Sequence, residues 1–300
     1  MPALKFKRRD PKRLMIDLIV LAAVILLGVS GWLWWNKIVM DPGRVLDDAI
    51  ARNLQTRSIV KHVSQSGVTG GVEQTSYLSF FPPSVRSQAS TVLSQGIGSN
   101  SASITTETIG TPEVDYVRYT SVEGADNLIG TDRLKQLLGI WSKREQNVGG
   151  NEASFLNETL FGILPYGYFN DEQRSQLIEM LDQKDVYRYT STTKSIENKR
   201  PVYTYEMSIN PSQLVEFMRQ YTVLSGVGNP SDLDPEQYKG LGDIRVRLVI
   251  DILSRQVKRI EYPTGRTETY NGQNLYRQIE LPSQTIPVEE LQRRLQGQNA

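Results

Sequence analysis

The chain has 300 residues, no cysteine and a formal net charge of +1. Without cysteine it can hold no disulfide, no thiolate metal site, no cysteine nucleophile and no lipid-modified cysteine anchor. The charge is unevenly placed, because Lys and Arg crowd the start of the chain and the remainder is mildly acidic. A nucleic-acid surface needs clustered basic residues to displace counterions from phosphate, so we expect no nucleic-acid partner.

An apolar segment at residues 14–35 follows the basic tail at residues 1–13. It is long enough to cross a hydrocarbon layer ~30 Å thick as a helix, and Asp17 is its one charged residue. The basic tail predicts a cytoplasmic N-terminus. We therefore expect a single-pass protein of the cell membrane whose C-terminal domain is extracytoplasmic. A cleaved signal peptide is the alternative, but the apolar run is long for one and no A-x-A site follows it.

A short amphipathic helix is expected next, within a juxtamembrane segment at residues 36–56. Asp41 is a suitable N-cap and Pro42 suits the first helical position. From residue 57 onwards β-branched and aromatic residues dominate, and Gly or Pro turns separate them. The first predicted strands are residues 58–66, 72–81, 89–95, 101–109 and 113–122.

The middle of the chain favours helices. Apolar residues recur at helical spacing, and Asn170 and Asn210 stand at the expected N-cap positions. The predicted helices are residues 131–138, 151–164, 170–183 and 210–221, with a short strand at 139–145. A polar loop at residues 226–242 follows the last of these helices, as a lid or as a plain connection.

A meander closes the domain, which we place at residues 57–282. Its first three predicted strands are residues 243–251, 257–262 and 267–270. Asn271-Gly272 is a strong signal for a tight hairpin turn and predicts a fourth strand at 275–281. The last residues, 283–300, form a C-terminal tail, and we expect its residues 288–300 either to form a terminal helix or to stay mobile.

The predicted elements define a fold class. About ten strands interrupted by a few helices, without βα alternation, predict an α+β fold. Its expected form is a large curved antiparallel sheet, a half-barrel, with helices on one face. The near-repeat DYVRYTS at residue 115 and DVYRYTS at residue 185 fits this form as two strands of one sheet, because neither copy carries a plausible catalytic partner.

Two stretches carry a family resemblance. VIDILSRQVKRIEYPTGRTETYNG at residues 249–272, and YVRYTS followed by GIWSKRE at residues 116–145, resemble the LolA-like and LppX-like envelope lipoproteins. That resemblance implies a curved, incomplete antiparallel barrel around helices, with a cavity that carries lipids or lipoproteins. A helical anchor departs from the family, whose familiar members are soluble or lipidated on cysteine.

Catalytic and metal signals are weak. His62 is the only histidine, so a multi-His metal site is excluded. S-x-x-K occurs at Ser58 and Lys61, but on a strand this spacing directs the two side chains to opposite faces. The acidic residues within 232–236 lack the glycine and later glutamate of an EF-hand. We expect no cofactor, no metal and no enzymatic activity.

Apolar helix residues give the most informative prediction. We expect them to face the concave side of the sheet, where incomplete packing would leave room for a lipid or other hydrophobic ligand. The candidate ligand residues are Phe155, Leu160, Phe161, Leu164, Leu214, Phe217 and Met218. The expected partners are the membrane bilayer, such a ligand and an envelope protein. The alternatives are an interaction or assembly module with a filled core and an uncharacterised envelope enzyme.

Overall fold

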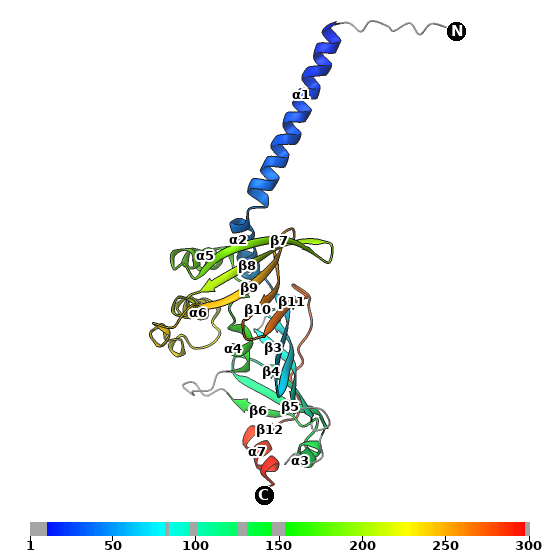
Figure 1. Ribbon diagram of the computed structural model, residues 1–300. Helices are drawn as coiled ribbons and strands as arrows, with labels where there is room; N and C mark the ends of the chain where they lie inside the picture. Colours follow the sequence, from blue (N-terminus) through cyan, green and yellow to red (C-terminus); the bar gives the residue numbers. More distant parts are fainter. Residues whose placement is uncertain (1–10, 82–83, 97–100, 125–130, 146–153, 298–300) are drawn as a thin grey trace, which may run out of the picture. The chain divides into compact units, whose positions relative to one another are not determined.

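The computed structural model describes residues 11–81, 84–96, 101–124, 131–145 and 154–297 (Figure 1). The chain divides into two compact units, Met1–Asp47 and Asp48–Ala300. We call the second unit the sheet domain. Most of the predicted basic tail, residues 1–10, lies outside the described residues.

The first unit is dominated by one long helix. Helix α1 (Pro11–Trp34) continues into a π-helical turn, η1 (Trp35–Val39). The stretch Ile19–Val39 is long and apolar enough to cross a membrane, and its most apolar window is not buried. It overlaps the predicted segment at residues 14–35. The following helix, α2 (Pro42–Asn53), begins as predicted, because Asp41 Oδ1 accepts a hydrogen bond from the Arg44 amide at 2.9 Å.

The sheet domain is built on one curved, unclosed sheet (Figure 1). Twelve strands of the described residues lie in the order β12-β6-β5-β4-β3-β2-β1-β11-β10-β9-β8-β7. All neighbours pair antiparallel except β12 and β6, which are parallel. The strands are β1 (Ser58–Gly67), β2 (Gly70–Ser79), β3 (Arg86–Gln95), β4 (Ala102–Gly110), β5 (Val114–Gly124), β6 (Ser142–Glu145), β7 (Tyr187–Glu197), β8 (Arg200–Ile209), β9 (Ile244–Asp251), β10 (Gln256–Glu261), β11 (Thr267–Asn271) and β12 (Ile286–Pro287).

Several helices accompany the sheet, so the α+β class is confirmed, and the expected purely antiparallel pairing holds except at β12. The helical elements of this unit are α3 (Thr131–Gln136), α4 (Phe155–Leu160), α5 (Asp171–Gln183), α6 (Pro211–Ser225), η3 (Pro230–Asp232), η4 (Pro235–Tyr238) and α7 (Val288–Gln296). Helix α4 packs on β2, β3 and β4, and α5 packs on α6. Both predicted asparagine caps are confirmed, because Asn170 accepts from the Gln173 amide and Asn210 from the Gln213 amide.

The helix predicted over residues 151–164 is shorter than expected. Residues 151–153 lie outside the described part of the chain, and α4 ends at Leu160. Gly162 and Pro165 follow closely, and a residue before proline avoids the helical region. In this chain that residue is Leu164. Phe161 already takes an extended backbone, and residues 161–164 continue as a non-helical segment.

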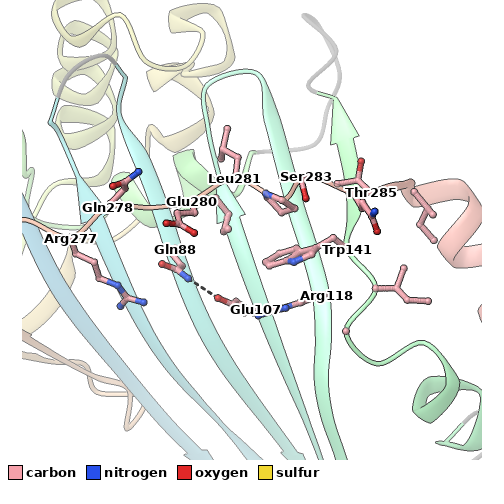
Figure 2. Close-up of a pocket in the computed structure, with 16 residues that line it drawn as sticks. Gln88, Glu107, Arg118, Trp141, Arg277, Gln278, Glu280, Leu281, Ser283 and Thr285 are labelled. Carbon is pink, nitrogen blue, oxygen red and sulfur yellow. Dashed lines mark hydrogen bonds and ion pairs between the residues drawn. The ribbon is translucent and has the colours of Figure 1, made fainter.

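The fourth strand predicted after Asn271-Gly272 is wrong. Gly272 does turn the chain in the left-handed region, at φ 60°, but β11 already pairs with β1 on one side and β10 on the other. β11 therefore has no free edge with which residues 275–281 could form a hairpin. They instead begin a C-terminal strap, residues 275–285, which crosses the strands over one face of the sheet (Figure 2).

Hydrogen bonds and a small apolar cluster hold the strap. Tyr77 Oη donates to Leu275 O and accepts from the Arg277 amide, each at 2.9 Å. Ile279 is buried against Tyr77 and Ile109. The strap then enters β12, which pairs with β6, and α7 follows. Part of the predicted C-terminal tail at residues 283–300 is therefore an element of the domain.

We expect Tyr77→Phe to loosen the strap. The substitution keeps the ring but removes the hydroxyl that holds Leu275 and Arg277, at a cost of about 1–2 kcal/mol. Trypsin cleavage after Arg277 in the full chain should then become about tenfold faster, because proteolysis follows local opening. Tyr276→Phe is the matched control, since Tyr276 is 70% exposed and its hydroxyl has no hydrogen bond within the described residues. Equal cleavage rates in the two variants would contradict the expectation.

The near-repeat supplies two strands in different surroundings, as the structural interpretation predicts. Asp115 on β5 is buried, pairs with Arg144 at 3.1 Å and accepts a hydrogen bond from the Phe155 amide at 3.0 Å. Asp185 precedes β7, is exposed and has a left-handed φ of 50°. The first aspartate of the repeat therefore holds the start of α4 in one copy and lies in a turn in the other.

Candidate functional site

Alternation along β1 separates the two faces of the sheet. Lys61 and Ser58 are three positions apart, so their side chains leave on opposite faces. Ser58 Oγ donates to Leu275 O of the strap at 2.7 Å, whereas Lys61 Nζ donates to Thr159 O of α4 at 3.3 Å. This confirms that the S-x-x-K spacing does not bring the serine and the lysine together. One face therefore carries the strap and the other carries α4.

A cleft of about 360 Å³ lies on the helix side, and we call it the helix–sheet cleft. Strand β1, the end of α4, helix α6, the loop that carries η3 and η4, and the β10–β11 turn surround it. The apolar lining residues are Phe161, Ile163, Leu214, Val215, Met218 and Leu233. The polar lining residues are Lys61, Glu158, Tyr238, Tyr262, Arg266 and Glu268. We call the apolar lining residues the apolar wall of the cleft and the polar lining residues its ionic side.

Glu268 is the centre of the ionic side. It is 2% exposed, and its Oε1 accepts hydrogen bonds from Arg266 Nη2 at 2.7 Å and from Tyr262 Oη at 3.1 Å. Its Oε2 accepts from Tyr270 Oη at 2.5 Å. Burial alone would raise the pKa of this carboxyl, but Lys61, Tyr270 and Arg266 outweigh burial and hold the pKa below its ordinary value.

Lys61 lies close enough to Glu268 for a Coulombic interaction, but the described residues show no hydrogen bond between the two side chains. Its ammonium carries three N–H donors, and among the described residues its one hydrogen bond goes to Thr159 O at 3.3 Å. Burial lowers the pKa of Lys61, although Glu268 acts in the opposite direction. The side chain lines both the helix–sheet cleft and a small void next to it, so its unused donors lie where a ligand would enter.

The predicted ligand residues divide into three groups. Phe161, Leu214 and Met218 line the helix–sheet cleft. Leu160 and Leu164 border the neighbouring void of about 10 Å³, which has room for about one water molecule. The remaining two lie elsewhere: Phe217 is fully buried in the core, and Phe155 is half-buried at the start of α4.

The loop at residues 226–242 belongs to the wall of this cleft. Leu233 and Tyr238 line the space, and Ser212 Oγ of α6 donates to Pro235 O at 3.0 Å. Asp234 uses its carboxylate to cap η4, by accepting from the Glu236 amide at 3.0 Å. Within the described residues no group of three His, Asp or Glu side chains is arranged to hold a metal ion.

Sequence reasoning missed the ionic side of the cleft. Glu268 stands between two threonines on a strand whose alternation puts it on the same face as Tyr270, and a buried glutamate needs partners. That pattern was a usable signal for an ionic cluster. The pairing of β11 with β1, which sets Glu268 opposite Val63 and diagonal to Lys61, left no local trace in the sequence.

A second cavity, the strap groove, lies on the other face (Figure 2). It measures about 740 Å³, and strap residues roof it over Gln88, Glu107, Arg118 and Trp141. Its floor is already paired: Glu107 accepts from Gln88 Nε2 at 2.6 Å and from Arg118 Nε at 2.8 Å, and Arg118 stacks 4.5 Å from the centre of the Trp141 ring. The charges of that floor are thus satisfied without a ligand.

Two comparisons with known proteins bear on the identity of the chain. No protein-family model matches the chain, and no curated protein matches it either. The geometry of the cleft and the apolar helix of the first unit are the features that bear on function.

Proposed function

We propose that this protein is a membrane-anchored, extracytoplasmic binding protein that holds a lipid or other hydrophobic ligand in the helix–sheet cleft. The cleft, at about 360 Å³, carries the proposal, because small-molecule sites typically measure about 300–1,000 Å³ and combine apolar walls with a few polar groups. The role is non-enzymatic. The resemblance to LolA-like and LppX-like proteins, with a half-barrel that wraps around helices, belongs to the same proposal.

The apolar helix supports the proposed location. A stretch such as Ile19–Val39 is long enough to act as a single-pass anchor, and the basic residues before it favour a cytoplasmic N-terminus. The sheet domain would then stand outside the cytoplasm, next to the membrane that is its expected partner and a source of apolar ligands.

Filling the cleft tests the proposal. Leu214→Trp places a bulky indole ring on the cleft wall and should reduce co-purifying apolar species about tenfold, because the ring occupies space that the ligand would fill. The full chain is purified in detergent and its bound species are measured by native mass spectrometry. Val223→Trp on the same helix is the control, since Val223 is 57% exposed and the control experiences the same annular lipid. Equal retention by the two variants would argue against a ligand in this cleft.

The second candidate function is an envelope interaction or assembly module. The strap groove favours it, because its large polar cavity of about 740 Å³ suits a protein segment better than an acyl chain. The mass-spectrometric experiment separates the two functions. A wild-type chain that retains no more apolar species than Leu214→Trp would leave the interaction module as the better explanation.

A further inference from the structure

We propose that the helix–sheet cleft selects anionic amphiphiles, with Lys61 as the residue that recognises the head group. This inference rests on the proposed function and adds the chemical class of the ligand. The expected ligand has one apolar chain and a negatively charged oxygen group at its end, a carboxylate or a phosphate.

The first step concerns the carboxylate next to Lys61. Glu268 is almost fully buried and accepts hydrogen bonds from Arg266, Tyr262 and Tyr270. Arg266 Nε also donates to its Oε1 at 3.0 Å. Three of these bonds go to Oε1 and one goes to Oε2, so side chains other than Lys61 hold this carboxylate in place. Glu268 therefore balances the charge of Lys61 from a distance without using its N–H groups.

The second step concerns the donors that remain. Among the residues that the structure describes, Lys61 Nζ is bonded only to Thr159 O, at 3.3 Å, which leaves two of its three N–H groups for another acceptor. Its position on the lining of the cleft makes those donors accessible to a bound molecule. An anionic head adds a Coulombic attraction to the ammonium that a neutral hydroxyl lacks, so an anionic head gains more here than a hydroxyl.

The third step concerns the chain of the ligand. Phe161, Leu214 and Met218 lie on the same cleft as Lys61, and they offer no polar atom to a head group. An acyl chain can pack against them while its head reaches the ammonium. Glu158 at the exposed edge of the cleft adds a negative charge, which disfavours anions placed the other way round, with the head at that edge.

A photolabelling competition on the full chain in lipid nanodiscs tests the inference. The probe is a neutral diazirine-bearing dodecanol, and labelled peptides are mapped by mass spectrometry. The competitors are dodecanoate, dodecyl phosphate, dodecanol and dodecylamine. In the wild type we expect the two anions to compete about tenfold better than dodecanol and dodecylamine to compete worst. The better of the two anions identifies the head group as carboxylate or phosphate.

The Lys61→Met variant then assigns the selectivity to one residue. The anions should lose their advantage over dodecanol, while competition by dodecanol itself stays within about twofold. Partition into the bilayer is the same for both proteins, so it cancels in this comparison. Lys194→Met, at an exposed position on β7, should keep the wild-type order.

The outcomes separate this inference from the proposed function. Labelling of peptides with Phe161 or Leu214, together with equal competition by all four head groups, would overturn the selectivity and leave the binding function standing. Absence of label from those peptides would remove the binding function itself. Should Lys61→Met not fold, the wild-type series of head groups decides alone, and an unchanged anion preference in a folded Lys61→Met would exclude Lys61.

Discussion

Replacing Glu268 by alanine is expected to lower the free energy of unfolding of the sheet domain by about 3 kcal/mol. The substitution leaves the hydroxyls of Tyr262 and Tyr270 without their acceptor and leaves Lys61 and Arg266 without their nearest negative charge. Arg266 is 40% exposed, so water compensates part of the loss and keeps it below the full cost of an isolated buried charge. Urea unfolding of the full chain in a non-ionic detergent, followed by circular dichroism, measures the change.

Glu280→Ala is the matched control for this experiment. Glu280 lies on the strap, is exposed and lines the strap groove. Its removal should change stability by less than about 0.5 kcal/mol. A Glu268→Ala variant as stable as Glu280→Ala would mean that the ionic side of the cleft does not hold the sheet together.

Glu268 also makes the stability depend on pH. The folded pKa lies below the ordinary value of 4.5, so the unfolded chain binds more protons than the folded chain as the pH falls through this region. The contribution of Glu268 is therefore complete above about pH 4.5 and is lost as the pH falls through the folded pKa. Glu268→Gln removes the titrating carboxyl. The difference in free energy of unfolding between wild type and variant should therefore become smaller as the pH falls below about 4.5. A difference in free energy of unfolding that stays constant at every acidic pH would mean that Glu268 is not the source of this pH dependence.

Local patterns were sufficient to predict most elements of the sheet domain. Alternation identified β1 to β5 and β9 to β11, and caps such as Asn170 and Asn210 identified α5 and α6. These signals lie within a few residues of the element that they specify. For the same reason, the α+β class follows from the order of elements along the chain.

Features that depend on distant pairing were not predictable in this way. Residues 275–281 have the composition of a strand, but β11 pairs with both β1 and β10 and has no free edge for a hairpin partner. The cleft poses the same problem, because its ionic side joins Lys61 of β1 to Glu268 of β11. The apolar wall was within reach of sequence reasoning, since Leu214 and Met218 recur at helical spacing on α6.

Helical spacing alone does not separate core residues from ligand residues, and Phe217 illustrates why. It shares α6 with Leu214 and Met218, but it is 0% exposed and we expect a structural role for it. Phe217→Ala should cost about 3–5 kcal/mol and lower the thermal midpoint of the sheet domain by about 10 °C.

Val223→Ala, on the same helix at a position that is 57% exposed, should stay within about 0.5 kcal/mol of wild type. Differential scanning fluorimetry of the full chain compares the two variants. The structural role requires the large loss, because a side chain enclosed on all sides leaves a cavity when it is truncated. A loss below about 1 kcal/mol for Phe217→Ala would mean that the interior around α6 is loosely packed, which would extend the ligand space from the cleft wall at Leu214 into the core.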